Sequence, residues 1–131
     1  MISYVDTSAA MKLLVEEPQT APLVAYLQSP VEGERRLIAS WLLHTELHCA
    51  ANRHPDAIDA ESVGIVLDTV SLIDLTRGDL LTAGMLPGGL RSPDAVHLAV
   101  ALRAGAGEIV CYDTELIAAA ESAGLAVIAP G

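Results

Sequence analysis

Four acidic side chains stand out because of the residues around them: Asp6, Glu46, Asp94 and Asp113. Asp6 directly follows the apolar run 2–5 and Asp113 directly follows the run 108–112, and each run is typical of a buried strand. The carboxyl ends of parallel strands open on one edge of a sheet. We therefore expect these two carboxylates at the same edge, although an Asp after a strand is also a common turn or cap residue.

Asp94 and Glu46 are expected on helices that are otherwise strongly apolar. Ser92 is the expected N-cap of the first of these helices, which places Pro93 at its first position and Asp94 in its first turn. An acid there complements the helix dipole, and at the mouth of a buried helix it also faces a cleft. Glu46 needs either a partner or a solvent-exposed face among its leucine neighbours.

Four carboxylates that converge repel one another, and some of them protonate unless a cation compensates. Magnesium and manganese prefer oxygen ligands of this kind. Two such ions about 4 Å apart activate water and stabilise the leaving oxygen in phosphodiester cleavage. The acids therefore predict a metal-dependent hydrolytic site that needs no Ser or Cys nucleophile.

Other groups of residues give weaker indications of a functional site. His44 and His48 share a helix face at a spacing of four residues, but no convincing third zinc ligand follows and the His-Glu order of zinc proteases is absent. His97, one turn after Asp94, is expected to be packed rather than catalytic. The chain has no glycine-rich phosphate loop followed by Lys and Ser or Thr.

Strands are expected to alternate with helices along the chain. The strands are expected at 2–5, 36–39, 70–75, 108–112 and 125–128, and the helices at 8–15, 20–28, 40–53, 57–68, 78–86, 92–104 and 114–123. Thr7 or Ser8 is the expected cap of the first helix. This alternation predicts an α/β fold, a central parallel sheet with helices on both faces, as a single domain over residues 1–131.

The composition of the chain indicates where the protein acts and what it could bind. The chain of 131 residues is 52% apolar, but its apolar runs are too short for a membrane span, and Asp6 interrupts any leader. We expect a cytoplasmic protein whose Cys49 and Cys111 are reduced and packed. The net charge of −10 disfavours binding to nucleic acid and favours binding to a basic protein partner. Five of the cations could still form a local patch: Arg35, Arg36, Arg77, Arg91 and Arg103.

The four acids, their order and their surroundings resemble the PIN-domain family, specifically its VapC-type toxins of type II toxin–antitoxin pairs. The matching segments are Val5-Asp6-Thr7-Ser8, Thr45-Glu46-Leu47, Ser92-Pro93-Asp94-Ala95-Val96-His97-Leu98-Ala99 and Tyr112-Asp113-Thr114-Glu115-Leu116. The resemblance implies a three-layer α/β/α sandwich and a Mg²⁺- or Mn²⁺-dependent endoribonuclease that a cognate antitoxin inhibits. It also implies an RNA substrate and a homodimer.

Carried over residue by residue, the resemblance makes Asp6 and Asp94 the main metal ligands, with Glu46 and Asp113 completing the cluster. Ser8, or failing that Thr7, would hydrogen-bond near Asp6, and Glu115 would be peripheral. Arg91, just before the helix of Asp94, is a candidate phosphate contact. The antitoxin would be a basic peptide in an apolar groove, where Trp41 and Leu42 are candidate lining residues.

Three alternatives remain at this point. A response-regulator receiver domain also places acids at strand ends, but needs an acidic pair after the first strand and a late Lys, whereas Lys12 is the only lysine. A haloacid-dehalogenase-like phosphatase needs a second Asp where Ser8 stands. A PIN-like protein that serves only as a binding partner would not need the full set of acids.

Overall fold

The computed structural model describes residues 1–131 and contains one five-stranded sheet in the order β3-β2-β1-β4-β5. Its strands are β1 (Ile2–Val5), β2 (Arg36–Ser40), β3 (Ser71–Ile73), β4 (Glu108–Val110) and β5 (Ala126–Ile128). All four pairings are parallel. The alternation of apolar strands with amphipathic helices has therefore produced the expected parallel sheet.

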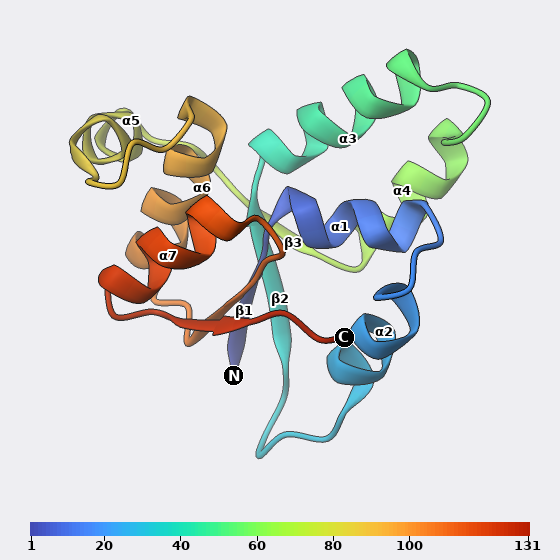
Figure 1. The fold of residues 1–131 in the computed structure, drawn as a ribbon, viewed down its shortest axis with the longest axis horizontal. Helices are drawn as coiled ribbons and strands as arrows, with labels where there is room; N and C mark the ends of the chain where they lie inside the picture. Colours follow the sequence, from blue (N-terminus) through green and yellow to red (C-terminus); the bar gives the residue numbers. More distant parts are fainter.

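Helices cover both faces of this sheet. Figure 1 shows four of them on one side: α1 (Thr7–Leu14), α2 (Thr20–Gln28), α3 (Leu42–Arg53) and α4 (Ala60–Asp68). The other side carries α5 (Arg77–Met85), α6 (Ser92–Arg103) and α7 (Thr114–Ser122). The predicted three-layer α/β/α sandwich is confirmed. No helix is long and apolar enough to cross a membrane.

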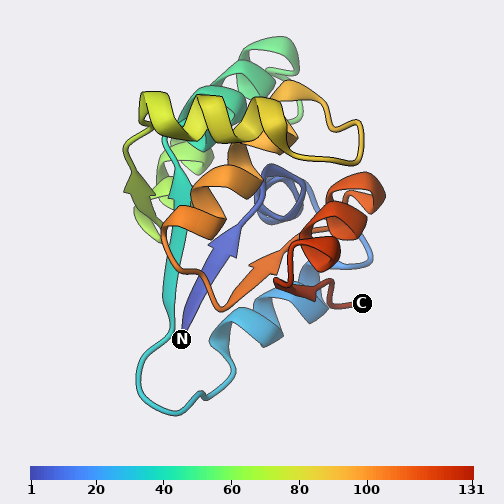
Figure 2. The same ribbon diagram turned by 90° about the vertical axis from the view of Figure 1, so that its left-hand side faces the viewer.

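The chain reverses its direction across the sheet beside β1. It first adds β2 and β3 on one side of β1, then returns to add β4 and β5 on the other side. Figure 2 shows β1 and β4 next to each other, with α1 leaving the end of β1. Crevices form outside the carboxyl ends of strands at such a switch point. Asp6 and Asp113 follow the two strands that flank it.

The core lies on both faces of β1 and β4. Tyr4, Val5, Ile109 and Val110 are at most 1% exposed. The segment of α6 from Ala95 to Ala101 is buried throughout, so this helix is an inner element rather than a surface one. Burying apolar surface stabilises the fold by about 25 cal/mol per Å². The packing of this segment is therefore the main force that fixes the start of α6, where Asp94 lies.

Two of the arginines expected to form a cationic patch are instead held in ion pairs. Arg35 Nη1 donates to Glu108 Oε2 at 2.9 Å at the amino edge of the sheet, and both side chains are at least 92% buried. Arg103 Nε donates to Asp79 Oδ1 at 2.6 Å and connects α6 to α5. Both pairs stabilise packing, so the expected patch is wrong as far as Arg35 and Arg103 are concerned.

Several element boundaries differ from those expected because other residues cap the helices. Asp6, not Thr7 or Ser8, is the N-cap of α1. Arg91, not Ser92, is the N-cap of α6, and Asp94 is the third residue of that helix. Asp59 caps α4, so this helix begins at Ala60 rather than at residue 57. The strands β3 and β4 are shorter than expected, with three residues each.

Candidate active site

Asp6 is fixed at the end of β1 by its own helix. Its Oδ2 accepts from the backbone N–H of Ser8 at 3.1 Å and from Ser8 Oγ at 2.6 Å. The side chain caps α1, and the residue is only 2% exposed. Its other oxygen, Oδ1, is buried without any hydrogen-bond partner. Burying a carboxylate oxygen that accepts no hydrogen bond costs free energy, and a bound cation would offset this cost.

Ser8 also connects this segment to the segment that carries Asp113. Ser8 Oγ accepts from the backbone N–H of Tyr112 at 2.9 Å, and the Asp6 N–H donates to the carbonyl of Val110 at 3.0 Å. Asp113 in turn caps α7, because its Oδ1 accepts from the Leu116 N–H at 2.9 Å. The two strand-end acids are thus held at the same edge of the sheet, as their positions in the sequence predict.

Asp94 lies close enough to both of these carboxylates for their charges to act on it. Its partial burial and, in second place, the charges of Asp113 and Asp6 together raise its pKa to about 6. No hydrogen-bond donor compensates for this charge in the structure. The raised pKa of Asp94 therefore reflects its burial first and, in addition, the like charge of the neighbouring acids.

Glu46 comes from α3 and is held by two polar side chains. Its Oε1 lies 2.8 Å from Thr7 Oγ1, which donates to it, and 2.5 Å from His97 Nε2. Thr7 therefore serves Glu46, whereas the resemblance placed it near Asp6. His97 is packed as expected, at 0% exposed, but it also makes a polar contact with the acid cluster.

One feature common to three of the acids bears on metal binding. In Asp6, Glu46 and Asp113, one carboxylate oxygen accepts hydrogen bonds from the protein and the other accepts none. No three His, Cys, Asp or Glu side chains form a ready-made metal site. The donor set is nevertheless one for a hard cation, because each acid is oriented through one oxygen and keeps another for a ligand.

The remaining predicted residues lie as follows. Arg91 is exposed at the start of α6, three residues before Asp94. His44 and His48 have ring centroids 4.5 Å apart, but no third ligand joins them. Cys111 is buried, whereas Cys49 is exposed, so the expected packing of Cys49 is wrong. Burial raises the pKa of the Cys111 thiol to about 12, which excludes it as a nucleophile near neutral pH.

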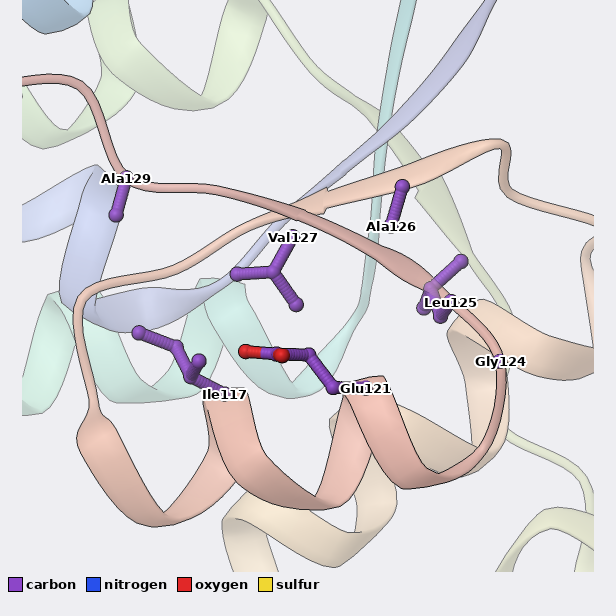
Figure 3. Close-up of a pocket in the computed structure, with 7 residues that line it drawn as sticks. All are labelled: Ile117, Glu121, Gly124, Leu125, Ala126, Val127 and Ala129. Atoms are coloured by element: carbon purple, nitrogen blue, oxygen red, sulfur yellow. The ribbon is translucent and has the colours of Figure 1, made fainter.

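Two surface hollows differ in their chemistry. The largest lies between α7 and β5, where Glu121 points between apolar side chains such as Ile117 and Val127 (Figure 3). Its single carboxylate offers little for catalysis. A smaller hollow between α1 and α3 begins at Thr7 and Glu46 and includes Arg53. Only the second hollow adjoins the acids, and Arg53 is a candidate binding residue that the sequence did not indicate.

Comparison with known proteins agrees with this geometry. The PIN domain matches residues 3–122 of the chain. Ribonuclease VapC46 of Mycobacterium tuberculosis (strain ATCC 25618 / H37Rv) is 35% identical over 133 residues, which cover 97% of this chain and 96% of the relative.

Two solved structures share the fold at low identity. A toxin–antitoxin complex from Klebsiella pneumoniae aligns with a TM-score of 0.71 and 17% identity, covering 98% of both chains. VapC20 of Mycobacterium tuberculosis, a Sarcin-Ricin loop cleaving toxin, aligns with a TM-score of 0.71 and 16% identity, covering 98% of this chain and 99% of that one. The fold, the family match and the sequence relative agree: the chain belongs to the PIN domain family and, within it, to the VapC ribonucleases.

Proposed function

We propose that this protein is the endoribonuclease toxin of a toxin–antitoxin pair and hydrolyses RNA phosphodiesters with Mg²⁺ or Mn²⁺ held by Asp6, Glu46, Asp94 and Asp113. The observation that carries the proposal is the buried Asp6 Oδ1, which has no donor. It belongs to a set of acids in which burial and, in second place, the charges of Asp113 and Asp6 raise the pKa of Asp94. Family membership favours this function over a receiver domain or a phosphatase.

The division of labour among the residues follows from their contacts. Asp6 and Asp94 would be the principal ligands, because Asp6 is the most deeply buried of the acids and Asp94 uses neither oxygen in a hydrogen bond to the protein. Glu46 and Asp113 would bind directly or through water, each with the oxygen that the protein leaves free. Ser8 would hold Asp6 in place. A divalent ion there would activate water and neutralise charge on the leaving oxygen.

RNA binding would depend on few cations. Arg91 is exposed at the start of α6, and Arg53 borders the hollow beside Glu46. Neither makes an ion pair in the structure, in contrast to Arg35 and Arg103. We propose that Arg91 contacts a phosphate next to the cleaved bond. Such an RNA substrate implies that the protein acts in the cytoplasm.

The protein partner would be a basic antitoxin. The solved complex from Klebsiella pneumoniae is a toxin–antitoxin assembly on this fold. A net charge of −10 favours a partner with Lys or Arg, and Trp41, 46% exposed at the start of α3, offers an apolar contact. We propose that this partner is a peptide segment with a cation that reaches the acids, and that the toxin is a homodimer.

A cleavage assay tests the proposed function. End-labelled mixed RNA is incubated with the protein in Mg²⁺, in Mn²⁺ or in chelator, comparing wild type with Asp6→Asn and Glu115→Gln. Glu115 is an exposed acid two residues after Asp113, so its variant removes the same charge without touching the cluster. We expect metal-dependent cuts with wild type and Glu115→Gln, and at least a 100-fold loss with Asp6→Asn. Equal cleavage by Asp6→Asn would contradict the proposal.

A further inference from the structure

A buried chain of polar groups connects the backbone of β2 to Glu46. The Ser40 N–H donates to Tyr4 Oη at 2.9 Å, and Tyr4 Oη lies 2.7 Å from His97 Nδ1. His97 Nε2 lies 2.5 Å from Glu46 Oε1. Tyr4, Ser40 and His97 are fully buried. The chain thus begins in the core of the sheet and ends at one acid of the cluster.

Hydrogen-bond accounting fixes the direction of this chain. A carboxylate only accepts, so His97 Nε2 must carry the hydrogen that faces Glu46. Tyr4 Oη already accepts from the Ser40 N–H, and its own proton can be donated to His97 Nδ1, which lies 2.7 Å away. An arrangement that satisfies every group has Ser40 N–H donating to Tyr4, Tyr4 O–H donating to Nδ1, and Nε2–H donating to Glu46. Thr7 Oγ1 lies 3.0 Å from Nε2 and can accept from the same hydrogen. Low solvent access makes any other arrangement costly.

We infer that His97 is a positioning residue for the metal site: Tyr4 holds it in the Nε2–H tautomer, and it in turn orients Glu46 so that the second oxygen of Glu46 faces the acid cluster. This inference rests on the proposed function, because it gives Glu46 a ligand role. Thr7 supports the same orientation from α1, since its hydroxyl donates to the same Oε1 at 2.8 Å. Glu46 is thereby held from two sides through one atom.

The chemistry of the network explains why residues distant in sequence would matter to one metal ligand. Tyr4 lies on β1, His97 on α6 and Glu46 on α3, so one chain of hydrogen bonds ties three layers to the site. The Tyr4 and His97 rings meet edge to face at 69°, with centroids 5.7 Å apart, which restricts rotation of the imidazole. Partners that orient metal ligands in this way typically change metal affinity by about 10- to 100-fold when they are removed.

Two variants of His97 separate positioning from packing. His97→Gln places an amide N–H near the position of Nε2 and keeps a donor for Glu46. His97→Asn places its amide near the former position of Nδ1. This variant keeps the contact with Tyr4 but loses the hydrogen bond to Glu46. Both variants bury a similar polar group, so they are matched in their cost to folding.

The test measures Mn²⁺ binding to the purified protein by electron paramagnetic resonance, with Glu46→Gln as reference. We expect Glu46→Gln and His97→Asn to weaken Mn²⁺ binding about tenfold or more, and His97→Gln to remain within about threefold of wild type. Weak binding by Glu46→Gln with unchanged binding by His97→Asn would overturn the inference alone. Unchanged binding by Glu46→Gln would remove Glu46 from the proposed site, and the inference with it.

A second readout needs no variant of His97. Imidazole ¹⁵N shifts of wild-type protein report which ring nitrogen carries the hydrogen. We expect the Nε2–H tautomer in wild type, and a mixture of tautomers in Tyr4→Phe, which removes the donor to Nδ1. A wild-type spectrum with the hydrogen on Nδ1 would overturn the inference even if the variants failed to fold.

Discussion

At the scale of single residues, the four acids differ in how the protein supports their charge. Asp6, Glu46 and Asp113 each receive hydrogen bonds from neighbouring side chains or backbone. Asp94 receives none, and its burial, together with the charges of Asp113 and Asp6, raises its pKa to about 6. Asp94 is therefore the one acid of the four whose carboxylate receives no hydrogen bond from the protein.

Asp94→Asn is expected to stabilise the metal-free protein. The folded-state pKa of about 6 lies above the usual Asp value of 3.8, so protonation of Asp94 stabilises the folded state. Stability from this group is complete below pH 3.8 and is lost as pH rises through 6. At pH 7.5 the variant should gain about 1–2 kcal/mol, a figure that already discounts the solvent screening of a partly exposed group.

Urea unfolding in chelator at a series of pH values checks this expectation. The gain should be complete above pH 6 and shrink as pH falls towards 4, where wild-type Asp94 is itself protonated in the folded state. Added Mn²⁺ should stabilise wild type more than the variant, because the metal needs the carboxylate. A variant that is less stable than wild type at pH 7.5 in chelator would show that Asp94 is not crowded by like charge.

The sequence reveals the acids more readily than their partners. Asp6 and Asp113 can be predicted because a strand end fixes where a side chain emerges. The contact of His97 with Glu46 spans 51 residues, and that with Tyr4 spans 93 residues, so no local pattern indicates them. A lone histidine on an otherwise apolar buried helix was the only signal, and packing explained it equally well.

At the scale of elements, the two edges of the sheet have opposite roles. The carboxyl edge gathers negative charge at the start of α1, α6 and α7. The amino edge neutralises charge, because Arg35 pairs with Glu108, and Ser3 and Tyr26 also donate to that carboxylate at 2.8 and 2.7 Å. The first edge is arranged for a ligand and the second for stability.

Arg35→Met is expected to destabilise the fold without changing the site. The variant leaves Glu108 buried and without its cation, which typically costs about 3–5 kcal/mol. Urea unfolding measures the loss, and Mn²⁺ affinity should remain that of wild type. Arg36→Met is the matched control, because Arg36 is the exposed neighbour and should change stability by less than about 0.5 kcal/mol. Equal losses from both variants would contradict a stabilising role for the buried pair.

Element types follow from the sequence, and their ends follow less well. The alternation of apolar runs and amphipathic segments predicts every strand and helix that the structure contains. The starts of α1 and α6 are each displaced by one residue, since Asp6 and Arg91 take the cap positions that Ser or Thr residues were expected to fill. Asp6 both caps its own helix and belongs to the candidate site. The preference of Asp for cap positions does not by itself distinguish these two roles.

At the scale of the whole molecule, the net charge of −10 makes each free cation important for RNA. Arg91→Gln is expected to raise the KM for RNA several-fold with kcat nearly unchanged, and to reduce the slope of log affinity against log salt by about 1. Arg36→Gln, at the opposite edge of the sheet, should change neither quantity. Cleavage kinetics at three salt concentrations test this, and equal effects of the two variants would refute a local phosphate contact.

If the four carboxylates hold divalent metal, anomalous diffraction from crystals grown with Mn²⁺ should locate the ion among them. We expect manganese density within coordinating distance of Asp6 and Asp94, with Glu46 and Asp113 bordering it directly or through water. Crystals of Asp6→Asn under the same conditions should lose that density. Manganese bound only elsewhere in wild-type crystals, for example at His44 and His48, would show that the four acids are not the metal site.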